Sequence, residues 1–194
     1  GKKINTILQL RLHPTIVSLK NKINKQGHKK KFEVDLSYIT SRGNWYSHSW
    51  KGKTEKSGGI ATNIGVHFFD MLYFVFGELQ KNDVYYCSDD KASGFLEYKN
   101  ARVRWFLSTN QDDLPNHIKL QNQRTFRSII IDDEELEFSS GFTDLHTLSY
   151  KNILLNKGFG LRENLTAVET VSKIRSTKIF KSINNPHPSL TKYL

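Results

Sequence analysis

The chain has 194 residues, of which 37% are hydrophobic and 12% aromatic, so its composition allows one domain with a sizeable core and excludes a disordered chain. Cys87 is the only cysteine, which excludes an internal disulfide and favours a reducing, cytoplasmic setting. The longest apolar run, Met71 to Phe76, is too short for a membrane span. The formal net charge of +10 favours anionic ligands over cationic ones.

The first part of the chain alternates between strand and helix patterns. Residues Ile4–Leu12 alternate apolar and polar side chains, which predicts a strand. Residues Thr15–Ile23 have helical spacing, and Lys31–Thr40 alternate again as a second strand. A long loop follows at 41–59. Loops of this length in compact domains are usually functional or disordered, and the aromatic residues here make disorder the poorer interpretation.

The next element is an apolar helix that begins near Thr62 or Asn63 and runs to Phe76, where Gly77 ends it. The strand patterns after it comprise a strand at 82–88, a hairpin at 93–109 and a second hairpin at 124–140. Two helices, at 144–156 and 162–178, follow the strands.

This order predicts a single α+β domain over residues 1–194, with a largely antiparallel open sheet and helices on one face. The uncovered face of such a sheet often serves self-association. We therefore expect a homodimer or homotetramer formed through it.

The excess positive charge lies in the first part of the chain. Residues 1–56 hold 13 Lys and Arg against 3 Asp and Glu, whereas residues 57–194 hold 16 of each. A local positive field favours a sugar nucleotide, a carboxylate or a nucleic acid as ligand. The lysines of Asn21–Lys31 are better interpreted as a solvated helix end and loop, because charge runs are usually solvated faces.

Three polar residues interrupt the apolar helix at i, i+4 and i+7, namely Asn63, His67 and Asp70, so they share one stripe and can form a relay. His67 is the residue of the three that exchanges protons near neutral pH. Gly58 and Gly59 before the helix allow close approach of a ligand. The alternative is that His67 packs, Asn63 caps and Asp70 forms a salt bridge, and spacing alone leaves both interpretations open. A metal site is the weakest interpretation.

The stretch "SGGIATNIGVHFFDML" resembles the substrate-site helix of the Gfo/Idh/MocA oxidoreductases. The segments "LQLRLHP", "SRGNWYSHSWKG", "VRWFLS", "GFTDLHTLSY" and "NKGFGL" extend the resemblance over nearly the whole chain, toward the branch that acts on UDP-N-acetylglucosaminuronic acid. The resemblance implies the C-terminal, substrate-binding and oligomerising half of a dehydrogenase in lipopolysaccharide or O-antigen sugar synthesis, whose Rossmann domain is absent from these residues. "GFGLREN" joins two helices and is interpreted as a cap and turn, not a dinucleotide motif.

The resemblance also implies roles for individual residues. His67 matches the catalytic histidine, as general base or its assistant for oxidation of a 3-hydroxyl, and Asn63 stands where the family usually has Asp. Asp70 would support the helix or the histidine tautomer. The candidates for contacts with the uronate and diphosphate are Arg42, Trp45, Tyr46, Trp50, Lys51 and Lys56. Arg11 stands where the family approaches the nicotinamide and the sugar, and Gly59 is a further substrate-binding candidate.

NAD is the implied cofactor, with NADP as the alternative, held mainly by the absent domain. We expect no nucleic-acid partner, no membrane partner and no metal. Two other functions stay open: a non-catalytic sugar-binding or assembly domain, and a basic nucleic-acid-binding module, for which no RRM, KH or helix-turn-helix signature is present.

Overall fold

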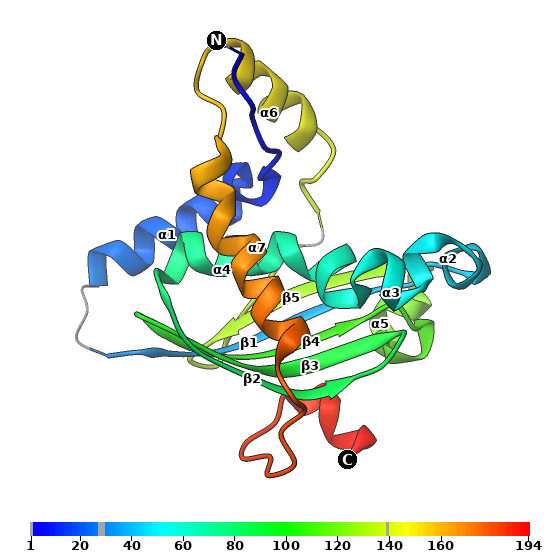
Figure 1. The fold of residues 1–194 in the computed structure, drawn as a ribbon. Helices are drawn as coiled ribbons and strands as arrows, with labels where there is room; N and C mark the ends of the chain where they lie inside the picture. Colours follow the sequence, from blue (N-terminus) through cyan, green and yellow to red (C-terminus); the bar gives the residue numbers. More distant parts are fainter. Residues whose placement is uncertain (1, 27–29, 139) are drawn as a thin grey trace.

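The computed structural model describes residues 2–26, 30–138 and 140–194, and shows a layer of helices on one face of a six-stranded sheet (Figure 1). The basic stretch at 27–29 and position 139 of the second predicted hairpin lie outside the described residues. The helices in chain order are α1 (Pro14–Gln26), α2 (Asn44–His48), α3 (Thr54–Ser57), α4 (Val66–Phe76), α5 (Asn116–Leu120), α6 (Leu145–Leu154) and α7 (Leu161–Ser176).

The sheet has the order β2-β3-β4-β1-β5-β6 and is antiparallel except for the β1–β4 pair, which confirms the predicted fold class. Its strands are β1 (Phe32–Thr40), β2 (Leu79–Cys87), β3 (Lys91–Tyr98), β4 (Ala101–Ser108), β5 (Thr125–Ile131) and β6 (Glu134–Glu137). Asp132 and Asp133 both have positive φ, 45° and 70°, as a two-residue hairpin turn between β5 and β6 requires.

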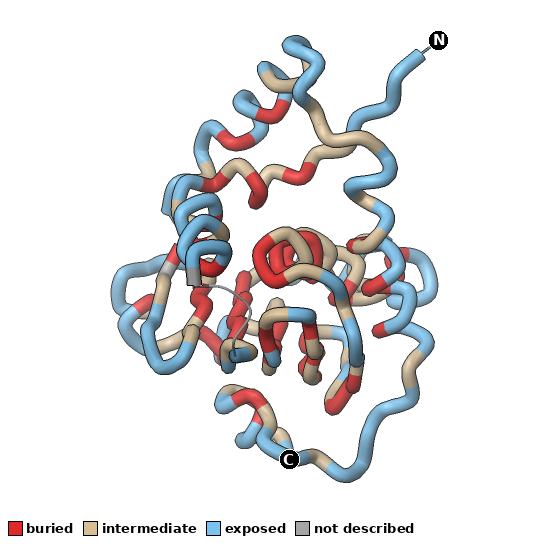
Figure 2. The backbone as a smooth tube through the Cα atoms, turned by 90° about the vertical axis from the view of Figure 1, so that its left-hand side faces the viewer, coloured by how far each residue is buried: buried red, intermediate tan, exposed pale blue. Residues whose placement is uncertain are grey.

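The core lies between the sheet and α4. Phe69 of α4 meets the fully buried Trp105 of β4 edge to face, with ring centroids 5.4 Å apart. Gly65, just before α4, allows this close approach, because a Cβ there would lie 2.7 Å from Phe69 and 2.8 Å from Leu107. Figure 2 shows the buried residues concentrated in the sheet and in the helix directly above it.

Helix α6 projects from the helical layer, and α7 returns from it across the sheet (Figure 1). The N-terminal segment runs beside α6, where Thr6 forms an isolated bridge with Phe159. This corrects the predicted strand at Ile4–Leu12: no strand of the described part of the sheet pairs with it, and Gln9–Leu12 form a 3-10 turn on which α6 packs. Among the described residues, no helix is long and apolar enough to cross a membrane.

The outer face of the sheet, away from the helices, is partly covered by the chain's own C-terminal segment (Figure 1). Leu190, in the 3-10 turn Pro188–Tyr193, is fully buried there. It packs with a small cluster from the sheet, α5 and the residue Leu114 before α5; the other members are Ile39, Tyr85, Phe106, Ile118 and Phe126. The sheet is open, as predicted, but part of its outer face is covered by the chain's own C-terminal segment.

Candidate functional site

His67 lies in the first turn of α4, directly after a π-helical turn at Ala61–Gly65. The chain enters this helix through Gly58 and Gly59, whose φ angles are 79° and 75°. Positive φ favours glycine strongly, so these two residues explain how the segment at 54–57 turns into the buried helix. Single π turns inside α-helices are frequent at functional sites.

His67 is half-buried, and among the described residues its ring makes no hydrogen bond. Burial lowers its pKa below the ordinary value, the Asp70 carboxylate opposes that shift, and His146 of α6 reinforces it. The imidazole is therefore held in its neutral form, which can accept a proton. This is the protonation state that a general base needs.

Asp70 forms a buried ion pair with Arg11 of the N-terminal 3-10 turn. Arg11 Nε and Nη2 donate to the two Asp70 carboxylate oxygens at 2.9 and 2.6 Å, and the two side chains are 7% and 2% exposed. Arg11 Nη2 also donates to the Glu163 carbonyl oxygen at 2.9 Å. Burial raises the pKa of Asp70, and the Arg11 guanidinium opposes the rise. Arg11 thus bridges Asp70 of α4 and the first turn of α7.

Asn63 contacts a different element from Asp70. Its Nδ2 donates to the Lys51 carbonyl oxygen at 2.9 Å. Burial raises the pKa of the nearby Tyr46 hydroxyl, and Asn63 and Arg42 both lie close enough to oppose the rise. The π turn adds a residue between Asn63 and His67, which displaces Asn63 around the helix. The three polar residues therefore do not act as the predicted single stripe: Asp70 pairs with Arg11, whereas Asn63 contacts the segment at 41–57.

The segment at 41–57 is a compact run of short helical turns rather than the predicted loop. Tyr46 is buried, whereas Trp45 and Trp50 are 57% and 56% exposed. These two indole rings therefore do not serve to pack the segment against the sheet. Arg42 Nε is buried without a hydrogen-bond partner among the described residues. Arg42 and Tyr46 line a cavity of about 320 Å³ whose far wall includes Asp90.

The remaining predicted residues are dispersed around this segment. Lys51 Nζ lies 5.8 Å from the centre of the Trp50 indole ring, and Lys56 is exposed on α3. Gly59 lines another cavity, of about 620 Å³, together with Arg175 near the end of α7. The structure therefore brings Arg42, Tyr46, Lys51 and Asn63 together, and separates Gly59 from Arg42 into two cavities.

The sequence did not predict a role for two residues near the site, Arg127 and His146. Arg127 of β5 has its guanidinium carbon 5.1 Å from the Tyr38 ring centre and 4.0 Å from that of Phe142. His146 lies in the first turn of α6, close enough to His67 to influence its pKa. The quoted segment "GFTDLHTLSY" contained Phe142 and His146, but neither residue shows a periodicity or spacing that places it beside His67.

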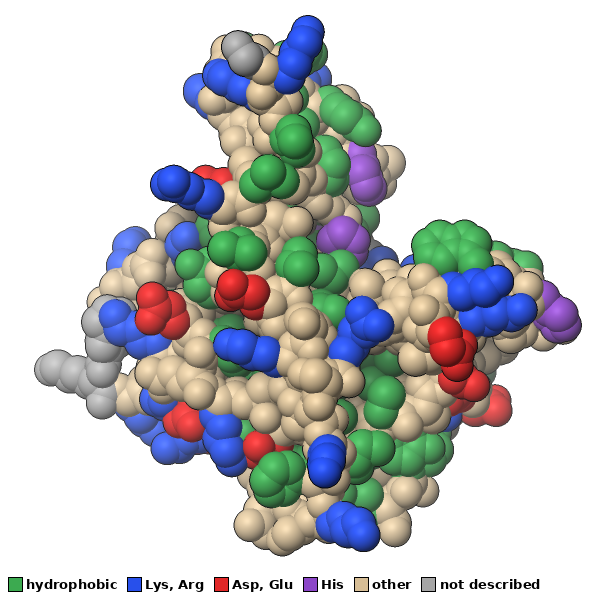
Figure 3. All heavy atoms as spheres, in the orientation of Figure 1, with side chains coloured by type: hydrophobic (Ala, Val, Ile, Leu, Met, Phe, Trp, Pro, Cys, Tyr) green, Lys and Arg blue, Asp and Glu red, His purple; other side chains and the backbone are tan. Residues whose placement is uncertain are grey.

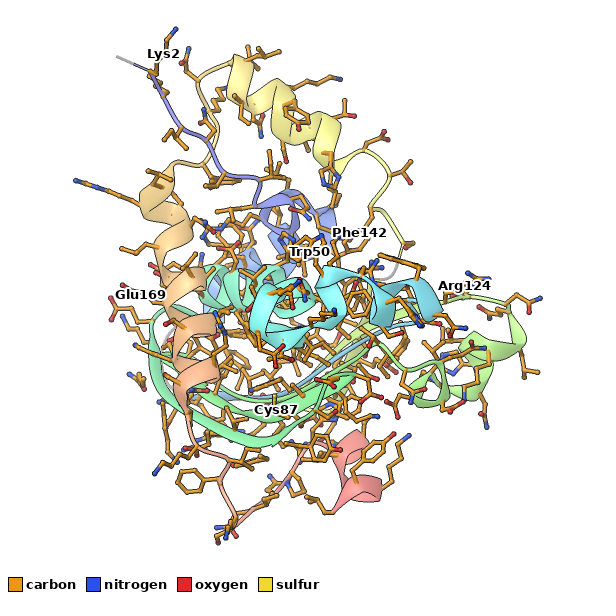
Figure 4. The ribbon with its side chains drawn as sticks, turned by 45° about the vertical axis from the view of Figure 1, so that its right-hand side comes forward. Lys2, Trp50, Cys87, Arg124, Phe142 and Glu169 are labelled. Atoms are coloured by element: carbon orange, nitrogen blue, oxygen red, sulfur yellow. The ribbon has the colours of Figure 1, made fainter. Side chains whose placement is uncertain are left out.

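The surface between α6 and the segment at 41–57 is hollowed, and histidine side chains lie along it (Figure 3). Trp50 lies in the helical layer above the sheet and Cys87 near its lower edge (Figure 4). The described residues include no cluster of three or more His, Cys, Asp and Glu placed to hold a metal.

The residues of this chain do not fit a dinucleotide site at "GFG". The Gly160 amide donates to the Glu163 carboxylate at 2.9 Å and opens α7, as the predicted cap and turn require. A Cβ at Gly158 would lie 2.6 Å from Ile153 and 2.7 Å from Asn5, so this glycine serves close packing within the chain.

Comparison with known proteins places the chain in a family. Residues 20–119, just over half of the chain, match the model of the C-terminal alpha/beta domain of the Gfo/Idh/MocA oxidoreductase family. Two crystal structures of the WlbA (WbpB) dehydrogenase from Thermus thermophilus, one with NAD and alpha-ketoglutarate and one with NAD and UDP-GlcNAcA, are 43% and 42% identical, with TM-scores of 0.91 and 0.90. Each match covers 97% of this chain and 60% of that one.

The WlbA dehydrogenase from Bordetella pertussis, in complex with NADH and UDP-GlcNAcA, shares the fold at 18% identity, with a TM-score of 0.69 over 95% of this chain and 64% of that one. The chain therefore spans about 60% of the length of the Thermus thermophilus protein that it matches. The chain belongs to the Gfo/Idh/MocA oxidoreductase family and corresponds to its C-terminal alpha/beta domain.

Proposed function

We propose that this chain is the substrate-binding domain of an NAD-dependent dehydrogenase that oxidises the 3-hydroxyl of a UDP-N-acetyl-hexosaminuronic acid in bacterial surface-polysaccharide synthesis. The observation that carries the proposal is the 42% identity, over 97% of the chain, to a dehydrogenase whose structure contains NAD and UDP-GlcNAcA. The cytoplasmic setting inferred from the single cysteine agrees with such an activity.

His67 is the proposed base for the reacting hydroxyl. Its neutral imidazole takes the hydroxyl proton, and the Asp70 carboxylate, held by Arg11, stabilises the positive charge that develops on the ring. Arg11 is therefore proposed to act through Asp70 rather than to touch the substrate. Asn63 fixes the segment at 41–57 next to His67 through its hydrogen bond to the Lys51 carbonyl oxygen.

Arg42 is the proposed ligand of the uronate carboxylate or the diphosphate. A buried guanidinium Nε without a partner is costly unless an anion satisfies it, and Arg pairs bidentately with both groups. The exposed Trp45 and Trp50 rings offer apolar faces to the sugar or the uracil, and Lys51, Lys56 and Gly59 complete the anionic environment in this proposal. The dinucleotide, NAD or NADP, is held by residues outside this chain.

The test is a calorimetric titration of the chain with UDP-N-acetylglucosaminuronic acid and with UDP-N-acetylglucosamine, which lacks the carboxylate. We expect the acid to bind more tightly. Arg42→Ala should weaken binding of the acid about tenfold, the value of a lost charge-assisted hydrogen bond. Arg162→Ala, at an exposed site on α7, serves as the control. Equal binding of both nucleotides, or an Arg42→Ala variant that binds as the native chain does, contradicts the assignment.

We also propose a homo-oligomer that forms through the half of the outer sheet face that the C-terminal segment leaves uncovered. Arg102 pairs there with Glu33 at 2.8 Å, and the two side chains are 50% and 53% exposed, so this surface carries both charge signs, as a self-complementary contact can use. Light scattering should show a dimer or tetramer that Arg102→Glu weakens and Arg162→Glu does not. A monomer at all concentrations would refute this interface.

A further inference from the structure

The C-terminal segment ends in a buried ion network centred on Asp113. The Tyr193 hydroxyl donates to the Asp113 carboxylate, Ser108 Oγ donates to it at 2.6 Å, and Lys192 Nζ lies 2.7 Å from it. The Asp113 side chain is completely covered. Burial acts to raise the pKa of Asp113, but these three partners outweigh it and hold the pKa below its usual range. The network therefore fixes the last residues of the chain on the sheet.

Lys91 links this network to the turn between β2 and β3. Its Nζ lies 3.8 Å from Asp113 Oδ2 and 2.6 Å from Asp90 Oδ2, and it stands 4.7 Å from the centre of the Tyr193 ring. Asp90 also accepts hydrogen bonds from Ser88 Oγ at 2.8 Å and Asn110 Nδ2 at 3.2 Å. The conformation of the turn thus depends on contacts that reach the end of the chain.

The same turn forms one wall of the cavity that contains Arg42 and Tyr46. Asp89 and Asp90 line this cavity, and Thr54 of α3 donates from Oγ1 to Asp89 Oδ1 at 3.3 Å. A continuous series of polar contacts therefore connects the C-terminal segment, through Asp113, Lys91 and the turn, to the segment at 41–57.

We infer that the 3-10 turn Pro188–Tyr193 positions the segment at 41–57 for substrate binding, with Asp113 and Lys91 as positioning residues that do not touch the substrate. The link to substrate rests on the proposed function, whereas the coupling between the two segments does not. The C-terminal segment therefore has two tasks: Leu190 covers the sheet, and the Tyr193–Asp113 contact orders the cavity wall.

Tyr193→Phe tests the coupling, because it removes the hydroxyl that Asp113 accepts and keeps the ring that stacks on Phe106. Hydrogen exchange measured by mass spectrometry should show amides of 41–57 and 88–91 exchanging about fivefold faster, with α1 and β5 unchanged. Tyr150→Phe, an exposed tyrosine on α6, should change none of these regions. Unchanged exchange at 41–57, or an equal increase in all four regions, overturns the inference.

A second measurement connects the coupling to substrate. UDP-N-acetylglucosaminuronic acid should bind Tyr193→Phe and Lys192→Met about threefold more weakly than the native chain, while Lys192→Arg restores native affinity. If the native chain binds but both variants bind equally well, positioning is refuted and the proposed function stands. If Arg42→Ala does not weaken binding while exchange at 41–57 still rises in Tyr193→Phe, the proposed function fails and the coupling stands.

Discussion

His67 and Asp70 are three residues apart on α4, yet they have different surroundings. Asp70 is buried against Arg11, whereas His67 is only partly buried and lies close enough to His146 of α6 to be influenced by it, with its pKa lowered by burial. The Asp70 carboxylate opposes the shift that burial causes, so the two effects together set the basicity of His67. This arrangement is the residue-scale basis of the proposed proton transfer.

Asp70→Asn should lower the pKa of His67 further. The substitution removes the carboxylate that opposes the shift and leaves Arg11 without an anionic partner, and both changes disfavour imidazolium. A pH titration of the imidazole signals by NMR, with His67→Asn used to assign them, measures the effect. Asp112→Asn, at an exposed carboxylate, is the control. A His67 pKa that rises in Asp70→Asn would contradict the account.

At the scale of elements, the C-terminal segment depends on a buried histidine. His187 Nδ1 accepts from the Ser189 amide at 3.1 Å, so the ring proton is on Nε2, which donates to Ser37 Oγ at 3.2 Å. The ring stacks on Phe106 with centroids 5.7 Å apart. Burial, with a smaller contribution from Arg104, lowers the pKa of His187 to about 3. Ser37 is therefore a hydrogen-bond acceptor for His187 and not a nucleophile activated by it.

The low pKa of His187 predicts acid sensitivity. Between its ordinary value of 6.5 and about 3, the unfolded chain binds a proton that the folded chain does not, so stability falls as pH falls. Between pH 7 and pH 5 this group should remove about 2 kcal/mol of the free energy of unfolding. Urea denaturation of His187→Asn should show a correspondingly smaller loss over this range, whereas His48→Asn, at an exposed site, should lose as much as the native chain. Equal losses in all three chains would contradict the burial argument.

The elements that the sequence predicts well are those whose pattern is local. The alternation in β1, the hairpin through Lys99–Asn100 and the apolar run of α4 all depend on near neighbours. The π turn occurs where Gly65 packs closely against Leu107, and the 3-10 turn at Gln9–Leu12 occurs where no described strand pairs with the chain. Neither condition is visible in a periodicity.

At the scale of the whole molecule, the two faces of the sheet have different proposed functions. The helical face carries His67 and the segment at 41–57, and the outer face carries the C-terminal segment and the charged surface around Arg102 and Glu33 that is proposed for self-association. The family resemblance predicts a role for His67, but it does not reveal the Arg11–Asp70 pair, which spans 59 residues, or the Tyr193–Asp113 contact, which spans 80. Pairings of this length follow from the assembled fold, so the sequence alone could not reveal them.

The most direct test of the central claim is an amide chemical-shift map of the isotope-labelled chain titrated with UDP-N-acetylglucosaminuronic acid. We expect the largest shifts on residues 42–56 and 63–67, on the helical face of the sheet. Shifts confined to the cavity of about 570 Å³ between α1 and the β5–β6 hairpin, or to the outer face of the sheet, would contradict the proposed substrate site.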